Sequence, residues 1–331
     1  MNFGLTDEQL EIQSTAREFL AARFKPEKVR ELAEWGTYDE GLWREISELG
    51  WPGIAVAESD AGQGLGIIEL VLLAEQCGYA LAPTPLASTW SAALFLSEGS
   101  DEQRARWLPG VASGESRGAA AFGPRRREVV PDAEGAAVLV LSAGEDAAVI
   151  VEPDAASIEP LDLVDTTRRY FTVAARDGEP IAGDVAAAAD RSLVVLAAEL
   201  VGVAQRALEM AVAYAKEREQ FGRPIGAYQA VSHRCAQMLY DVEEARSLTY
   251  YAAWCSGAEP ESLPLAASMA KARSSDAARA VTAAALQVFG GIGFTWEHDV
   301  HFLLKRARVS AELLGTARQH RERVASLVGL G

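Results

Sequence analysis

The chain has 331 residues, of which 49% are hydrophobic and 24% are charged, so one or two compact domains are expected and disordered or fibrous classes are excluded. Its 31 basic and 47 acidic residues give a net charge of −16, which repels nucleic acid and anionic membrane surfaces. Three scattered cysteines, an acidic N-terminus and apolar runs too short to cross a membrane predict a cytoplasmic protein without disulfides, export signal or membrane span.

The first third of the chain shows the apolar spacing of α-helices. Thr6 and Gln9 form a capping-box pattern at the start of a helix predicted over 6–21, and further helices are predicted over 40–49, 67–80, 87–97 and 101–113. The glycines of GQGLG (62–66) do not have the spacing of a dinucleotide-binding fingerprint, so an ordinary loop is favoured there. We expect residues 1–117 to form an α-helical N-terminal domain.

The composition changes between residues 118 and 184. Short apolar or alternating runs, divided by acidic and glycine-bearing turns, predict a small β domain over 118–184. Helical periodicity then returns over four long segments, 190–218, 228–256, 261–289 and 297–328. Because the links between them are short, residues 185–331 are predicted to form an antiparallel four-helix bundle, and the fold class is mostly α with a small β domain.

Two junctions between the long helices carry informative residues. The run REQFGRPIG (218–226) ends one helix with glycine and proline, as an ordinary helix end and tight turn would. The run QVFGGIGF (287–294) holds three glycines, which let another backbone or a ligand approach closely. His298 and His301 could form half of a metal site, but nothing nearby completes it and no metal is predicted.

These two junctions continue into the runs REQFGRPIGAYQAVSHRCAQM and QVFGGIGFTWEHDVHFLLKRA. Together with WPGIAV, GQGLG and LPGVASGE, in the same order, they resemble the acyl-CoA dehydrogenase family over most of the chain. The resemblance implies an N-terminal helical domain, a middle β domain and a C-terminal four-helix bundle. It also implies FAD-dependent α,β-desaturation of an acyl-CoA thioester, in which a carboxylate removes the Cα proton and an electron-transfer flavoprotein is the electron acceptor.

The resemblance implies contacts with FAD at seven positions. Three residues resemble those that reach the FAD of a neighbouring subunit: Arg218, Gln220 and Phe221. Three more resemble the glycine-rich turn that approaches the adenosine part of FAD: Gln287, Gly290 and Gly291. Thr316, which follows Gly315, resembles a threonine that contacts FAD. Because such contacts cross subunit boundaries, an oligomer is implied.

The catalytic base is where the chain departs from the family. The usual base position, immediately before Gly-Thr, holds Leu314, and the alternative position aligns with Ser192; neither side chain can act as the base. The only carboxylate deeper in the apolar run LVVLAAELVGVAQ of the first bundle helix is Glu199, seven residues after Ser192 and on a similar face. A glutamate among leucines and alanines serves either as a base with a raised pKa or as part of an ion pair, and both interpretations stay open.

The β segment is shortened as well. The family's Thr-Glu-Pro and Gly-Ser-Asp stretches and its tryptophan beside the flavin are replaced by GAAAFGPRRREVVPDAEG (118–135). This combination resembles the shorter subunits of actinobacterial α2β2 acyl-CoA dehydrogenases, including those acting on steroid side-chain CoA esters. The chain is therefore expected to help bind FAD beside a longer partner that supplies the base. The alternatives are a homo-oligomer that uses Glu199 as its base and a scaffold that has lost FAD.

Overall fold

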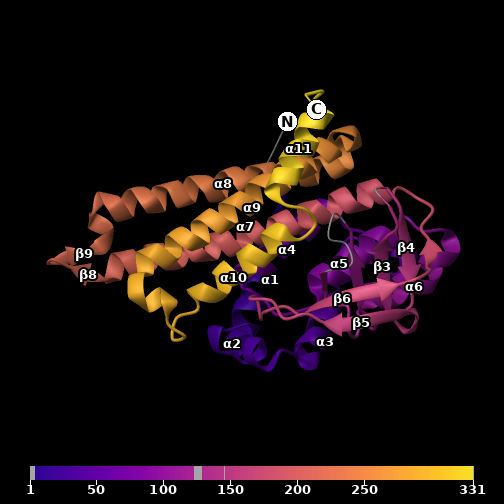
Figure 1. Cartoon of the computed structure of the whole chain (residues 1–331), viewed down its shortest axis with the longest axis horizontal. Coiled ribbons are helices and arrows are strands. Elements are labelled where there is room, and N and C mark those ends of the chain that lie inside the picture. Colours follow the sequence, from indigo (N-terminus) through magenta and orange to yellow (C-terminus); the bar gives the residue numbers. More distant parts are fainter. Residues whose placement is uncertain (1–3, 123–128, 145, 331) are drawn as a thin grey trace.

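The computed structural model describes residues 4–122, 129–144 and 146–330. Its N-terminal part is helical (Figure 1) and consists of α1 (Asp7–Arg23), α2 (Pro26–Trp35), α3 (Glu40–Glu48), η1 (Glu58–Asp60), α4 (Ile67–Tyr79), α5 (Leu86–Leu96) and α6 (Asp101–Ser113). The capping box at the start of α1 is formed as predicted, because the Thr6 side chain accepts from the Gln9 amide and the Gln9 side chain accepts from the Thr6 amide. The GQGLG segment is a loop, as predicted.

Helix α2 is an addition to the predicted elements. It begins with Pro26 at its first position and ends at Gly36, whose φ of 62° is left-handed. Its buried face consists of Val29, Leu32 and Ala33 alone. A helix this short presents too few apolar repeats for periodicity to indicate it clearly.

The β segment forms two small sheets. The first has the strand order β1 (Gly118–Ala121), β3 (Val138–Ser142), β4 (Ala148–Val151) and β7 (Glu179–Pro180). The second has the order β2 (Val130–Pro131), β6 (Tyr170–Ala175) and β5 (Ala156–Pro160), with the 3-10 turn η2 (Pro153–Ala155) leading into β5. The pair β1 and β3 is parallel, with Gly118 opposite Val138, and the other neighbours in both sheets are antiparallel.

The C-terminal part is a bundle of long helices. Its elements are α7 (Val185–Glu217), the hairpin β8 (Glu219–Gln220) and β9 (Arg223–Pro224), η3 (Ile225–Ala227), α8 (Gln229–Ala258), η4 (Pro260–Ser262), α9 (Leu263–Phe289), η5 (Gly290–Phe294), α10 (Val300–Glu312) and α11 (Ala317–Leu327). The predicted helical, β and helical order is confirmed. The hairpin and η5 lie at the same end of the bundle, away from α11 (Figure 1).

The prediction of one continuous helix over 297–328 is wrong. The chain is helical only from Val300 and breaks between Glu312 and Ala317. Leu314 and Gly315 have φ values of 59° and 103°, which lie in the left-handed region and end α10. The Thr316 side chain then accepts from the Gln319 amide and caps α11.

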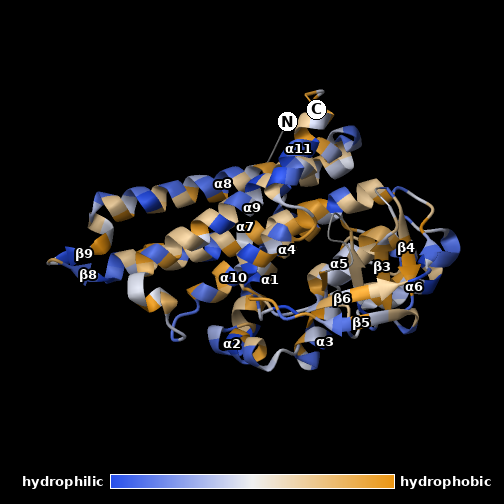
Figure 2. Cartoon of the chain, in the orientation of Figure 1, coloured by the Kyte–Doolittle hydropathy of each residue, from blue (hydrophilic) through white to orange (hydrophobic). Residues whose placement is uncertain are grey.

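One buried core joins the N-terminal helices to the bundle. Apolar residues concentrate where α4, α7 and α9 face one another, whereas the β8–β9 hairpin and much of α11 are hydrophilic (Figure 2). Gly202 of α7 lies so close to α4 that a Cβ atom there would come within 2.0 Å of the Glu75 carbonyl oxygen. The stretch Pro260–Phe294 is the one part of the described chain long and apolar enough to cross a membrane, and here it forms a core helix of the bundle, where Ala267, Ala270 and Ala278 are fully buried.

Candidate functional site

A cavity of about 620 Å³, called the main cavity because it contains both family base positions, is present among the described residues. It lies between α5, β1, the segment leading into β2, α7 and the two helices α10 and α11. Its wall is mostly apolar and includes Ala87, Ala121, Phe122, Val195 and Val309. A second hollow of about 750 Å³ adjoins it and shares Phe122, Leu314 and Gly315 with it. A space of this size and lining suits an organic ligand with a largely apolar body.

Both positions considered for a catalytic base line this cavity. Ser192 lies on α7 and donates its hydroxyl proton to the Ala188 carbonyl oxygen at 2.9 Å. Leu314 lies in the turn between α10 and α11, and its carbonyl oxygen accepts a hydrogen bond from His320 Nε2 at 2.9 Å. A leucine side chain has no lone pair, and a serine already donating to a carbonyl is a poor proton acceptor. The cavity wall is therefore without a base at either position.

Glu199 lies deeper in α7, where it is 4% exposed and held by two arginines. Arg168 Nη2 donates to both carboxylate oxygens at 2.8 and 2.9 Å, and Arg306 Nη1 donates to Oε1 at 2.7 Å. Burial alone would raise the pKa of Glu199, but the two guanidinium groups outweigh it and lower this pKa to about 2. Such a carboxylate is a weak base, so the geometry favours the ion-pair interpretation of Glu199.

The same arginines connect the β segment to the bundle. Arg306 of α10 also donates from Nε to Asp165 Oδ2 at 2.8 Å and from Nη2 to the Thr167 carbonyl at 2.8 Å. Tyr170 at the start of β6 donates to the same Asp165 oxygen at 2.7 Å. Arg168 is part of the cavity wall as well as of this network. The ion pairs therefore fix one side of the cavity to the helix that carries Ser192.

A second polar cluster lies beside the cavity and was not predicted from the sequence. Asp132, which is 4% exposed, accepts hydrogen bonds from the hydroxyls of Tyr38 and Ser88. Ser88 lines the cavity. Asp132 has a φ of 59°, an uncommon backbone conformation for a residue other than glycine, and burial raises the pKa of its carboxyl group. Since Tyr38, Ser88 and Asp132 are far apart in the chain, sequence spacing holds no signal for this cluster.

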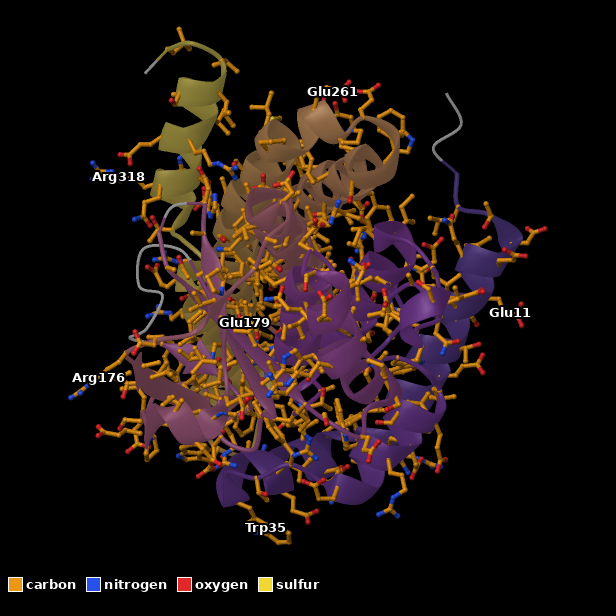
Figure 3. All side chains as sticks on the ribbon, turned by 90° about the vertical axis from the view of Figure 1, so that its right-hand side faces the viewer. Glu11, Trp35, Arg176, Glu179, Glu261 and Arg318 are labelled. Atoms are coloured by element: carbon orange, nitrogen blue, oxygen red, sulfur yellow. The ribbon has the colours of Figure 1, made fainter. Side chains whose placement is uncertain are left out.

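Charged side chains stand at the rim of the cavity. Arg308 and Arg318 contribute positive charge, and Glu312 and Glu322 contribute negative charge. Arg318 pairs with Glu322 at 2.9 Å and points away from α11 into solvent (Figure 3). Glu312 pairs with Arg279 at 3.2 Å. Both rim carboxylates are thus paired, and Glu322 is exposed and Glu312 half-buried, unlike the buried Glu199.

Six of the seven residues predicted to contact FAD lie at the far end of the bundle. Arg218 ends α7, Gln220 is in strand β8, and Phe221 at the hairpin tip is 92% exposed. Gln287 is exposed near the end of α9, and Gly290 and Gly291 follow it. A Cβ atom added at either glycine would meet nothing within 4 Å, so the surface there is open.

The seventh residue, Thr316, lines the main cavity and caps α11. Figure 1 shows the hairpin and η5 at one end of the long helices and α11 toward the other. A single chain therefore does not bring the seven positions together. A ligand contacted by both groups would have to lie between two chains.

The imidazole rings of His298 and His301 have different contacts and do not face a common site. His298 Nδ1 accepts from the Val300 amide at 3.2 Å, whereas His301 packs against Trp296 and Phe302. Burial lowers the pKa of His301 to about 4, so its ring is neutral at ordinary pH. In the part of the chain that the structure describes, no third histidine, cysteine or carboxylate joins them in a metal-binding group.

Comparisons with known proteins agree with the fold. Residues 6–115 match the model "Acyl-CoA dehydrogenase, N-terminal domain" and residues 186–328 match "Acyl-CoA dehydrogenase, C-terminal domain". Acyl-CoA dehydrogenase IpdE2 of Mycolicibacterium smegmatis is 34% identical over 327 residues, which are 98% of this chain and 100% of the relative. Acyl-CoA dehydrogenase FadE34 of Mycobacterium tuberculosis is 35% identical over 99% of this chain and 49% of its own length.

Two solved structures extend the comparison. A variant of the Tcur3481-Tcur3483 steroid acyl-CoA dehydrogenase superposes with a TM-score of 0.87 at 29% identity, covering 97% of this chain and 98% of the other. The ChsE4-ChsE5 complex from Mycobacterium tuberculosis superposes with a TM-score of 0.91 at 24% identity over the full length of both chains. At that lower identity the similarity concerns the fold.

Proposed function

Because this chain belongs to the acyl-CoA dehydrogenase family, we propose that it is the shorter subunit of a hetero-oligomer whose longer partner supplies the catalytic base. The observation that carries the proposal is the cavity wall, where the two family positions for the base hold Leu314 and Ser192. As an acyl-CoA dehydrogenase the enzyme is an oxidoreductase, and the α,β-desaturation of an acyl-CoA thioester needs a carboxylate to remove the Cα proton.

FAD, when bound, supplies the acceptor for the hydride that leaves Cβ. The residues that would hold it fit a cofactor with a pyrophosphate and several hydroxyls. Arg218 offers paired donors for a phosphate, Gln220 offers an amide, and the open surface at Gly290 and Gly291 admits a flat group close to the backbone. The backbone of Arg218 bonds to Tyr214 and Ile225, but its side chain is exposed and makes no hydrogen bond among the described residues, so the guanidinium donors are free for such a ligand.

Two observations bear on the assembly: the first supports two chains around one cofactor, and the second supports chains of two kinds. The proposed FAD contacts lie at the bundle end, while Thr316 lies at the cavity, so two chains are needed to surround one cofactor. Relatives of similar fold are described as the Tcur3481-Tcur3483 and ChsE4-ChsE5 pairs, each of two different chains. The relation to a steroid acyl-CoA dehydrogenase makes steroid-derived acyl-CoA esters a reasonable first group of substrates to test. An electron-transfer flavoprotein would then reoxidise the enzyme.

A self-sufficient homo-oligomer is the second candidate, and it requires Glu199 to be the base. The two arginines that lower the pKa of Glu199 to about 2 count against this role. A scaffold without FAD is the third candidate. Free Arg218 and the open glycine turn count against it, because a surface used only for assembly has no evident need for either.

The three candidates give different absorption spectra. The chain should be purified alone and together with a longer homologue from the same source, and each preparation should be treated with acyl-CoA. A colourless chain that yields a yellow, bleachable complex with the homologue supports the proposal. A yellow chain that is bleached on its own supports the homo-oligomer. A complex without flavin at any stage supports the scaffold.

A further inference from the structure

The turn between α10 and α11 has a backbone that needs support from outside. Leu314 and Gly315 are both left-handed, with φ values of 59° and 103°, and such a conformation is unfavourable for leucine. Glycine is required next to it, because a Cβ atom at Gly315 would come within 2.9 Å of His320 Nε2. Leu314 and Gly315 nevertheless form part of the wall of both cavities. Something must therefore hold this turn in place.

Lys271 of α9 supplies that support. Its amine Nζ lies 3.0 Å from the carbonyl oxygens of both Ala311 and Gly315, and 2.9 Å from Ser275 Oγ. Ala311 is in the last turn of α10, where carbonyl oxygens have no partner within the helix. Lys271 is fully buried and lines neither cavity among the described residues, so it contacts the turn from behind.

Lys271 has hydrogen-bond acceptors around its amine but no carboxylate partner among the described residues. No described carboxylate lies within ion-pair distance, since Glu312 of α10 pairs with Arg279 and Asp276 of α9 pairs with Arg321. Burial lowers the pKa of Lys271 to about 7. Its N–H groups donate to the two carbonyl oxygens and to the Ser275 hydroxyl oxygen.

The charged groups of α11 complete these surroundings. Burial lowers the pKa of His320 to about 4, so its ring is neutral and donates from Nε2 to the Leu314 carbonyl. Arg323 points to Asp190 of α7 and not to the amine. Three carbonyls of one short turn, those of Ala311, Leu314 and Gly315, are thus held by two side chains, the Lys271 amine and the neutral His320 ring.

We propose that Lys271 is a positioning residue: by holding the carbonyls of Ala311 and Gly315, it fixes the turn through which Leu314 and Thr316 meet the ligand in the main cavity. That this ligand is FAD, to which Thr316 is assigned, rests on the proposed function, whereas the hold on the turn does not. Lys271 acts through the turn and does not touch the ligand.

The test is Lys271→Met, which keeps the unbranched side chain as far as Cε and removes its donors. The matched control is Lys305→Met, because Lys305 of α10 stacks on Trp296 at 4.5 Å and does not contact the turn. Amide hydrogen exchange by mass spectrometry should speed up at least tenfold in the peptide covering 311–320 of Lys271→Met, with α8 unchanged. In the complex with the longer subunit, the dissociation constant for added FAD should rise by a similar factor.

A purely structural role of Lys271 predicts another result. Exchange would then rise over the whole molecule or nowhere, and the FAD affinity of the folded complex would stay within twofold of the Lys305→Met control, which would overturn the proposal. Should Lys271→Met not fold, Ser275→Ala removes one of the three partners of the amine and should give a change of two- to fivefold confined to the same peptide. If exchange in Ser275→Ala shows no local change, that result would also overturn the proposal.

The outcome also separates this inference from the proposed function. Faster exchange of the turn together with no FAD binding by the unmodified complex would leave Lys271 as the support of the turn and refute the proposed function. Normal FAD binding by the unmodified complex and by the Lys271→Met complex, with unchanged exchange of the turn, would refute the role of Lys271 and leave the proposed function standing.

Discussion

Glu199 and Lys271 are both buried side chains of ionisable type, and their neighbours decide their charge. Glu199 meets two guanidinium groups and stays ionised, while Lys271 meets two carbonyls and a hydroxyl but no described carboxylate, and burial lowers its pKa to about 7. The reason is the same in both positions. Burial penalises the charged form unless an opposite charge lies next to it. Neither state can be read from the residue type alone.

The ion-pair role of Glu199 predicts a large loss of stability in Glu199→Gln. Removing the carboxylate leaves the buried Arg168 and Arg306 with less negative charge, and we expect the free energy of unfolding to fall by about 3–5 kcal/mol. Urea denaturation of the purified chain measures it. The matched control is Glu217→Gln at the exposed end of α7, with an expected change within about 0.5 kcal/mol. A Glu199→Gln protein as stable as the control, with its activity abolished, would instead identify a base.

The lowered pKa of Lys271 predicts how stability depends on pH. Between about 7 and the ordinary value of 10.5 the unfolded chain binds a proton at this residue that the folded chain does not, so the stability contributed by Lys271 rises with pH in that window. Below about pH 7 both states are protonated and the contribution is flat. The difference in free energy of unfolding between the unmodified chain and Lys271→Met should increase by up to about 1.4 kcal/mol per pH unit from pH 8 to pH 9. A constant difference over this range would contradict a neutral buried amine.

At the level of elements, the break between α10 and α11 shapes the cavity. A continuous helix would carry residues 313–316 along one straight axis, whereas the left-handed pair Leu314 and Gly315 ends α10 and turns the chain into α11. Apolar spacing continues across the break, and this is why periodicity predicts a single helix there. Glycine followed by threonine was the local signal for a C-terminus and a new cap.

Gly315→Ala tests the strain in this turn. An alanine at φ 103° meets an unfavourable backbone conformation, and its Cβ would come within 2.9 Å of His320 Nε2, so we expect a loss of about 1–3 kcal/mol in a thermal or urea unfolding experiment. Gly257→Ala in α8, where a Cβ would meet nothing within 4 Å, should instead leave the chain equally stable or up to about 1 kcal/mol more stable. Equal effects at the two glycines would show that the turn is not strained.

At the scale of the whole molecule, the long helices separate two sets of functional candidates. The hairpin and the glycine turn lie at one bundle end, and the cavity lies beside α11 and the β segment. A chain built this way offers one surface to a neighbour and a cavity of its own. Phe221 at the hairpin tip is 92% exposed, which leaves its ring available to a neighbouring chain.

Arg218→Ala tests the function of the bundle end. In the complex with the longer subunit, FAD content after gel filtration should drop, with affinity weakened at least about tenfold, equivalent to about 1.4 kcal/mol. The free energy of unfolding of the isolated chain should stay within about 0.5 kcal/mol, because Arg218 is exposed. Lys216→Ala, a neighbouring exposed cation, is the control and should retain FAD. Flavin content equal in both variants would contradict the role assigned to Arg218.

The sequence by itself determined the order of helices and strands, the capping of α1, the family, and the absence of a carboxylate at positions 314 and 192. Each of these is a property of local spacing or of a contiguous motif. The sequence left open whether Glu199 is a base or an ion-pair partner. Tertiary structure brings Arg168 and Arg306 to Glu199 and so favours the ion pair. It likewise assembles the cluster around Asp132 and places Lys271 behind the turn. The charge of a buried group depends on neighbours that lie far away in the chain, and only the folded molecule brings them into contact.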